Sequence, residues 1–354
     1  MIPYIIAFVI TLLLVHRDAK KRNNWLYFII APLPLLLLVT FRDVNVGTDT
    51  KEYTNIYEYA SDSSGIIMFL GYTRIEPLYA ALTYFISALG LSIEFLFFIC
   101  ACLSIYPILI GARMMRNEVS QTYIVFLFCM MFFHYSMNIT RQAIAMAFLF
   151  LSVIYMLRQQ NVKSYCLIGV AFLFHYVVVV CIPLILLYQL RNSISKRGLA
   201  SLVVISFGIV YFVIPYINVD AVVNQYETNY FSVGRGGMQT SYTIEMIFNL
   251  TLVYTYVKSI CTKANAFLFK ASTLYVVVLN FLSILAPQVF RLALIMDILS
   301  ILYISILMTN KIHLHEMKTM KNIYTLFAII FWGFVFVLNH SGDTVPYTSK
   351  ILGF

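Results

Sequence analysis

Residues 41–53 read FRDVNVGTDTKEY and place charged side chains of both signs directly after a long apolar run. Within this stretch lie Arg42, Asp43, Asp49, Lys51 and Glu52, although only 11% of the chain is charged. Charges at the boundary of a membrane are costly and are retained mainly where they serve a function. The stretch therefore predicts the end of a hydrophobic helix and the start of a polar, functional segment at the membrane surface.

The rest of the chain has the composition of a membrane protein. Its hydrophobic fraction is 61% and its mean hydropathy is +0.86, whereas soluble domains are about 45–50% apolar. At roughly 20 residues per spanning helix, the 354 residues allow about 12 spans and little else. We therefore expect an all-α fold, a polytopic transmembrane helical bundle that forms one domain over residues 1–354. The first apolar run, residues 2–15, lacks the features of a cleaved signal peptide and predicts a retained helix.

The net charge of +9 is explained by membrane topology. Most of the 24 Lys and Arg residues gather in short clusters between apolar runs, and the positive-inside rule assigns those clusters to the cytoplasm. The clusters occupy residues 16–24, 113–117, 158–163, 191–197, 258–270 and 311–321. This distribution predicts membrane lipids as partners and argues against nucleic acid. The six cysteines lie in apolar runs without metal-ligand spacing, which indicates small buried residues.

The remaining connections are then predicted to be external. The first external loop, residues 42–75, is long, and the chain should also break at His175 because the run 164–190 has basic loops at both ends. Residues 77–112 must cross an odd number of times, yet Gly90 suggests a break, so one piece should be re-entrant or interfacial. The other predicted external segments are 134–142, 217–242, 286–291 and the tail from residue 340.

Few cations fall on the predicted external side, and all but two are arginines: Arg42, Lys51, Arg74, Arg141, Arg235, Arg291 and Lys350. The planar guanidinium binds phosphate oxygens in pairs and stays charged when partly buried. Several arginines at the ends of different helices could therefore hold an anionic lipid-linked diphosphate. Two purely structural alternatives stay open. Arg42 and Asp43 could form an ion pair at a helix end, and Arg235 could be an exposed charge on a loop.

Transfer to a hydroxyl also needs a group that accepts its proton. His175 interrupts an apolar run, where it could be that base or could bond a backbone carbonyl at a helix break. Asp49 could be the base, the N-cap of the following helix, or both. The predicted external candidates are Asp43, Asp49, Glu76, His134, His175, His340 and Asp343.

Motifs of other enzyme and transport classes are missing from the sequence. It contains no P-loop, no GxSxG and no HExxH. The two histidines of residues 313–315 are a weak metal signal in a basic cytoplasmic loop. We therefore expect a metal-independent mechanism without cofactors.

Several motifs together resemble the EpsG-like family, which is grouped with Wzy-type polymerases of bacterial exopolysaccharides and O-antigens. In chain order they are FR followed by VGTDTKEY, NITRQAIAMAF, FLFHYVVVV, VFRLALIMDI and DTVPYTSKIL, and they extend from about residue 40 to 350. The family usually carries an acidic residue beside its late arginine, where this chain has Phe290. An acid–arginine pair is therefore not expected at that position.

The resemblance implies a GT-C-like polymerase that joins oligosaccharide repeat units carried on undecaprenyl diphosphate. The reaction would take place at the outer face of the bacterial inner membrane, with a chain-length regulator and a flippase as partner proteins. We expect His175, Asp49 and Arg291 to be catalytic. We expect substrate binding by Arg42, Asp43, His134, Arg141, Gln142, Arg235 and Tyr347.

Two other functions remain open at this point. A flippase or transporter for the same lipid-linked sugars would need charges through the depth of the bundle, and Asp297 is the one such residue noted. A membrane O-acyltransferase acting on an external glycan would use a histidine such as His175.

Overall fold

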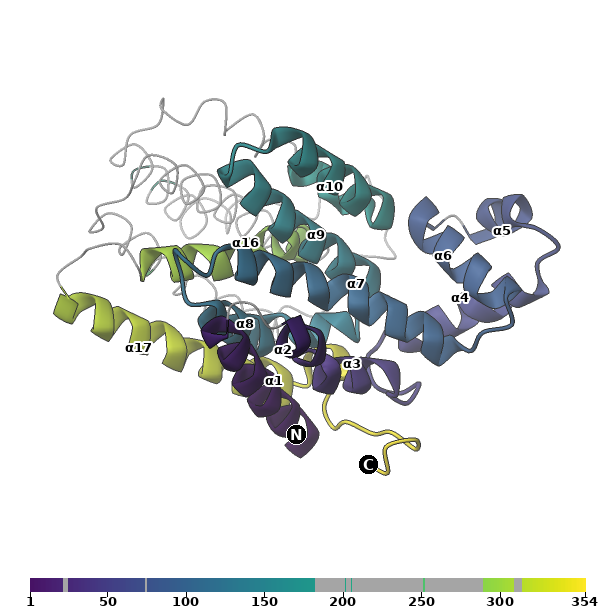
Figure 1. Ribbon diagram of the computed structural model, residues 1–354. Coiled ribbons are helices and arrows are strands. Elements are labelled where there is room, and N and C mark those ends of the chain that lie inside the picture. The colour runs from purple at the N-terminus through teal and green to yellow at the C-terminus, as the bar shows by residue number, and fades with distance from the viewer. Residues whose placement is uncertain are drawn as a thin grey trace. The chain divides into compact units, whose positions relative to one another are not determined.

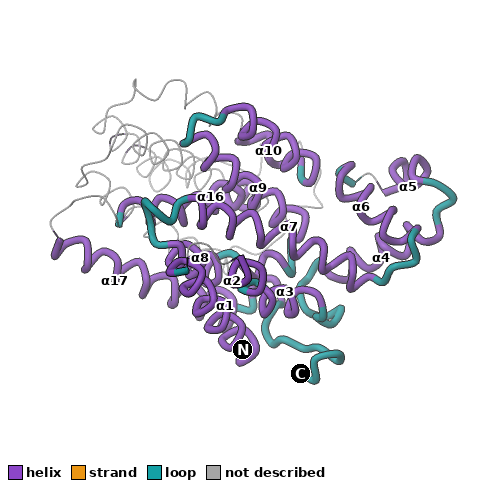
Figure 2. The backbone as a smooth tube through the Cα atoms, in the orientation of Figure 1, coloured by secondary structure: helices purple, strands orange, loops and turns teal. Residues whose placement is uncertain are grey.

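The computed structural model describes residues 1–21, 25–73, 75–181, 201, 205, 251, 289–308 and 314–354 (Figure 1). Every regular element in this part of the chain is a helix (Figure 2), so the all-α prediction is confirmed there. The chain divides into two compact units. The first contains Met1–Val179 and Ala328–Phe354, and the second contains Val180–Phe327.

Four helical segments in the described part are long and apolar enough to cross a membrane. They are α1 (Ile2–Lys20), α7 (Ile93–Met114), α9 (Thr140–Leu157) and the segment Thr319–Leu338. The last segment consists of most of α17 (Leu314–Phe331) and the π-helix Trp332–Leu338 that follows it. Together the four segments indicate a multi-pass membrane protein. The helix α1 continues past the apolar run that ends at residue 15 and includes basic residues in its last turn.

In the remaining apolar helices, the described apolar part is shorter than that of these four segments. They are α2 (Trp25–Ile30), α3 (Leu33–Thr40), α6 (Pro77–Ala88), α8 (Gln121–Met131), α10 (Asn161–Phe174) and α16 (Val289–Leu307, with Leu294–Ile306 as its described apolar part). The end of α10 at Phe174 confirms the predicted break at His175, which adopts an extended conformation before the 3-10 helix Tyr176–Cys181.

The segment predicted as a long external loop contains two helices, α4 (Thr50–Asp62) and α5 (Ile66–Thr73). In α4, Tyr53, Ile56 and Ala60 recur at helical spacing and are buried, while all four charged residues of the helix are exposed. This periodicity explains why a polar segment folds here instead of forming an open loop.

A break between α6 and α7 at Gly90, which has a φ of +67°, confirms the expected interruption in residues 77–112. With 12 residues, α6 is about 18 Å long, well short of the roughly 30 Å hydrocarbon layer. The 22 residues of α7 suffice for a full crossing. The lengths favour α7 as the crossing and α6 as the short piece.

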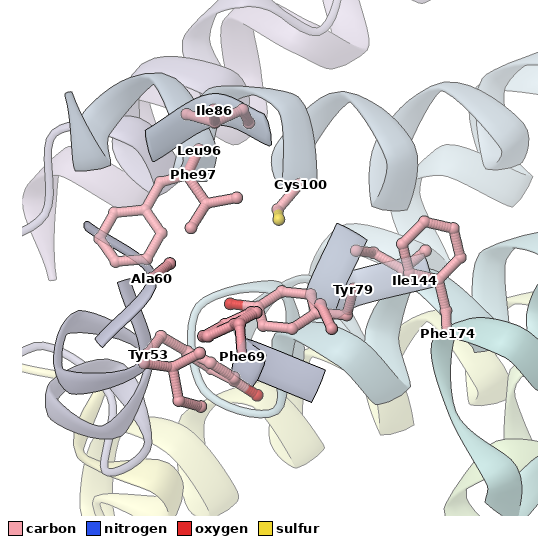
Figure 3. Close-up of a cluster of buried hydrophobic side chains, with 12 residues drawn as sticks. Tyr53, Ala60, Phe69, Tyr79, Ile86, Leu96, Phe97, Cys100, Ile144 and Phe174 are labelled. Carbon is pink, nitrogen blue, oxygen red and sulfur yellow. The ribbon is translucent and has the colours of Figure 1, made fainter. Parts of the chain in front are cut away.

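A buried apolar cluster connects α4, α5, α6, α7, α9 and the end of α10 (Figure 3). Its members include Tyr53, Tyr79, Phe97, Ile144 and Phe174. The cluster fixes the start of α6, the start of α9 and the end of α10 relative to one another, and these are the positions of the polar residues described next.

Candidate functional site

The carboxylate of Glu76 bonds Arg141 and His175 at the same time. His175 Nδ1 lies 2.5 Å from Glu76 Oε1, and Arg141 Nη1 forms an ion pair with Glu76 Oε2. The three residues are far apart in the sequence, since Glu76 is separated from Arg141 by 65 positions and from His175 by 99. The fold therefore brings the histidine of FLFHYVVVV and the arginine of NITRQ to one acid.

Each member of this triad lies at a helix end. Glu76 is the N-cap residue of α6, Arg141 is the second residue of α9, and His175 is the C-cap residue of α10. Backbone bonds hold the ends in place, among them His175 N–H to the Ala171 carbonyl at 2.9 Å. Side chains at helix ends can face the same polar surface while the helices pack through their apolar faces.

The triad is only partly covered. The side chain of Glu76 is 7% exposed, whereas those of Arg141 and His175 are 26% and 20% exposed. Burial by itself raises the pKa of Glu76, but the hydrogen bond from His175 and the charge of Arg141 outweigh it and lower the pKa to about 2. Glu76 is therefore an anion at neutral pH, with two reachable groups in front of it.

Arg141 would be unfavourable at the positive end of α9 without compensation. The carboxylate of Glu76 supplies that compensation, and two aromatic rings add to it. The guanidinium carbon lies 6.0 Å from the ring centroid of Tyr53 and 5.8 Å from that of Tyr79. These contacts fix the orientation of the cation.

Arg42 is buried, with 6% of its surface exposed. It donates from Nε to Thr50 Oγ1 at 3.1 Å and from Nη1 to the Val39 carbonyl, and its guanidinium lies 4.0 Å from the ring centroid of Phe97. Burial lowers the pKa of Arg42 to about 10, which leaves it charged at neutral pH. Its Nη2 is buried and has no hydrogen-bond partner among the described residues. These contacts place Arg42 beneath the surface, between α3, α4 and α7, and it makes no ion pair with Asp43 among the described residues.

The segment that follows Arg42 is hydrogen-bonded to two other parts of the chain, the C-terminal segment and the turn before α9. Gly47 has a φ of +92°, and its N–H donates to the Asp343 carbonyl at 2.9 Å. Thr48 donates from Oγ1 to Asn138 Oδ1 at 2.6 Å. The VGTDT, NIT and SGDT motifs thus meet at one junction.

Both aspartates of the opening stretch take part in this junction. Asp49 occupies the predicted N-cap position of α4, but its side chain makes no capping bond, and its Oδ1 lies 3.1 Å from Thr48 Oγ1. Asp43 accepts from the Lys350 backbone N–H at 3.1 Å. Both residues are partly exposed.

His134 has both ring nitrogens bonded inside the protein. Trp332 Nε1 donates to His134 Nε2 at 2.8 Å, so the ring proton belongs on Nδ1, which lies 2.7 Å from Thr344 Oγ1. The ring also stacks on Phe336, with centroids 4.3 Å apart. Burial, with the charge of the N-terminus, lowers the pKa of His134 to about 3. This arrangement leaves no ring nitrogen for a substrate.

Two other predicted binding residues are also covered. Tyr347 is 5% exposed and donates to the Leu38 carbonyl at 3.1 Å, and Gln142 is 2% exposed. The predicted Arg235 and the 217–242 loop lie outside the described residues. Arg291 is the third residue of α16, and its side chain is likewise outside the described part.

Glu76 is the main residue that the sequence-based selection left out. It stood among seven acids and histidines on the predicted external side, and nothing in its own neighbourhood distinguished it. One signal was present: an acidic residue directly before Pro77, at the start of an apolar helix, where a carboxylate is buried but close to the surface.

One known family matches this chain over almost its whole length. The model of the EpsG family matches residues 25–349, which include all three triad residues and the junction around Gly47. Neither a curated protein nor a solved structure matches the sequence. The match confirms the resemblance drawn from the five motifs, and the chain is a member of the EpsG family.

Proposed function

We propose that this protein acts in exopolysaccharide biosynthesis as a polymerase that joins oligosaccharide repeat units carried on undecaprenyl diphosphate. The proposal rests on one observation, the convergence of a reachable cation and a reachable imidazole on the buried carboxylate of Glu76. Glycosyl transfer from a diphosphate needs a cation for the leaving group and a base for the acceptor hydroxyl. Arg141 and His175 supply this pair.

The proposed reaction is a displacement at the anomeric carbon of the donor sugar. The acceptor hydroxyl oxygen forms a bond to that carbon while the bond from the carbon to the diphosphate oxygen breaks, and its electron pair goes to the diphosphate. His175 takes the hydroxyl proton and later returns it to solvent. Arg141 stabilises the charge that builds on the departing diphosphate.

The other predicted residues take different places in the proposal. Arg42 has a structural role in the proposal, since its contacts are with Thr50, Val39 and Phe97 inside the protein. Asp49 is partly exposed at the edge of the junction and is the second candidate base. Arg235 and Arg291 keep their predicted roles in diphosphate binding and catalysis, and the proposed protein is a GT-C-like bundle of about 12 spans that acts on the external face.

The test is polymerisation of a defined lipid-linked repeat unit by the purified protein in detergent. Arg141→Ala should lower the rate by about 10²–10³-fold, the usual cost of one lost donor to a developing negative charge. His175→Ala should lower it to a similar degree. Products are separated by length, so that single units are distinguished from polymer.

Matched controls come from the first helix. Arg17→Ala and His16→Ala change exposed residues at the predicted cytoplasmic end of α1 and should leave the rate within about two-fold of the wild type. Polymer of normal length and rate from either Arg141→Ala or His175→Ala would remove that residue from the mechanism. If the wild type moves the lipid-linked unit across vesicles without extending it, the protein is a transporter and the proposal fails.

A further inference from the structure

We infer that Glu76 is a positioning residue that fixes the tautomer of His175 and the orientation of Arg141. The inference rests on the proposed function for its kinetic consequences, but its structural content can be measured without any activity. It assigns a role to a carboxylate that none of the recognised motifs includes.

The first step in the argument is that Glu76 does not serve its own helix. An acidic residue at an N-cap commonly accepts from the backbone N–H groups of the first turn. The side chain of Glu76 makes no such bond, and Pro77 at the next position has no N–H. Both carboxylate oxygens are directed instead to groups from other helices.

The second step concerns the proton on His175. An ionised carboxylate can only accept, so Nδ1 of His175 must donate to Glu76 Oε1. In the neutral imidazole the lone pair is then on Nε2, which becomes the nitrogen able to take a proton from a substrate. A histidine held this way is a base with a fixed direction, as in nucleophile–base–orienter arrangements.

The third step is the order of burial. Glu76 is the least exposed of the three side chains, and its two partners are three to four times more exposed. A carboxylate behind two reachable groups cannot itself contact a large substrate easily, but it determines where those groups point. A simple stabilising ion pair would not require this order.

The fourth step is that both bonds depend on the shape of a carboxylate. An amide at position 76 could accept from only one of the two donors, and its NH2 group would face the other donor. Glu76→Gln should therefore disturb either the imidazole or the guanidinium while keeping the volume of the side chain. Glu76→Asp keeps the charge but is one methylene shorter, so it should retain one bond and recover part of the rate.

The decisive measurement is ¹⁵N NMR of the full-length protein with labelled histidine, above the pH range in which imidazole ordinarily ionises. The His175 signals are identified by their loss in His175→Gln. In the wild type they should show the tautomer with the proton on Nδ1, and in Glu76→Gln they should show a mixture. A wild-type His175 with its proton on Nε2, or with both nitrogens protonated at that pH, overturns the inference even if Glu76→Gln does not fold.

The kinetic measurement asks whether Glu76 acts through His175. Glu76→Gln should lower kcat by about 10²-fold or more with a much smaller change in KM. The losses from Glu76→Gln and His175→Gln should be clearly less than additive in the double variant, because Glu76 then has only Arg141 left to orient. Additive losses would mean an independent role and would contradict the inference.

A control carboxylate separates this role from general electrostatics. Glu94→Gln alters a partly exposed acid in the first turn of α7 and should change neither the tautomer nor the rate. The NMR and kinetic measurements also distinguish a failure of this inference from a failure of the proposed function. A protein without polymerase activity but with the fixed tautomer removes the proposed function and leaves the role of Glu76 standing, whereas an active protein with a mixed wild-type tautomer does the reverse.

Discussion

At the scale of single residues, the contacts of each charged side chain distinguish those that can reach a substrate from those that stabilise the fold. Residues 41–53 were expected to form a polar, functional segment at the membrane surface, and three of them make contacts within the protein. Arg42 lies under Phe97, Asp43 accepts from the C-terminal segment, and Gly47 approaches the turn before α9. Backbone and hydroxyl bonds from this stretch join three motifs at one junction, next to the turn that precedes α9.

Gly47 is required by both its conformation and its surroundings. Its φ of +92° disfavours a side chain, and an added Cβ would lie 2.6 Å from the Met137 carbonyl oxygen. Gly47→Ala should lower the free energy of unfolding by more than about 1 kcal/mol, measured by thermal unfolding in detergent. Gly65→Ala, where an added Cβ meets nothing within 4 Å, is the control and should be nearly neutral. Equal stability of the two variants would contradict the close approach.

His134 predicts a pH dependence of stability. Its pKa is about 3 in the folded protein and about 6.5 in an unfolded chain. Between these values the unfolded state binds more protons, so stability falls as the pH drops from 6.5 towards 3. The range from pH 6.5 to about 5 separates this effect from that of Glu76, because the contribution of Glu76 is lost as the pH falls through its usual pKa of 4.5.

His134→Phe should remove that slope. It keeps the ring on Phe336 but leaves Trp332 Nε1 without its acceptor, which should cost about 1–3 kcal/mol at neutral pH. Thermal unfolding in detergent at several pH values measures both effects, and His16→Phe, at an exposed position, is the control. An unchanged slope in His134→Phe would assign the pH dependence to other groups.

At the scale of helices, the close packing of α7 on α9 positions the start of α9 and with it Arg141. Gly111 permits this approach, since an added Cβ would lie 2.6 Å from Ile154 Cδ1 and 2.7 Å from Phe150 Cε1. Small residues at such contacts allow helices in membranes to approach closely. The apolar interface is therefore connected to the polar site through the length of α9.

Gly111→Val should separate the two helices locally. The expected cost is about 1–3 kcal/mol, typical of overpacking, with a lower melting temperature in detergent. Gly169→Val on α10 adds the same side chain where an added Cβ meets nothing within 4 Å, and it should be tolerated. A Gly111→Val protein as stable as Gly169→Val would show that α7 and α9 are not in tight contact there.

At the scale of the whole molecule, contacts join segments predicted for the same side of the membrane. On the predicted cytoplasmic side, Arg113 pairs with Asp18 at 3.6 Å and Arg158 pairs with Glu118 at 3.8 Å. On the predicted external side, the tail after residue 340 bonds the segment after α3 and the turn before α9. The sidedness of these two groups of contacts leads to a direct prediction.

Cysteine labelling tests that sidedness in intact cells. In a Cys166→Ser background, Asp62→Cys should react with a membrane-impermeant maleimide, because α4 is predicted to be external. Asn117→Cys should react only after the cells are made permeable, because the connection from α7 to α8 is predicted to be cytoplasmic. Both positions are exposed. The reverse pattern would invert the topology and place the triad on the cytoplasmic side.

The sequence by itself determined the class of the protein, the helix breaks at Gly90 and His175, and the family. These follow from hydropathy, from the spacing of basic clusters and from local motifs, all of which are properties of neighbouring residues. Only the tertiary structure decided the partners of each charge. It buried Arg42 and His134, and it joined Glu76 to Arg141 and His175 across 65 and 99 positions. A hydrogen bond depends on distance and direction in space, and local sequence does not specify either for residues on separate helices.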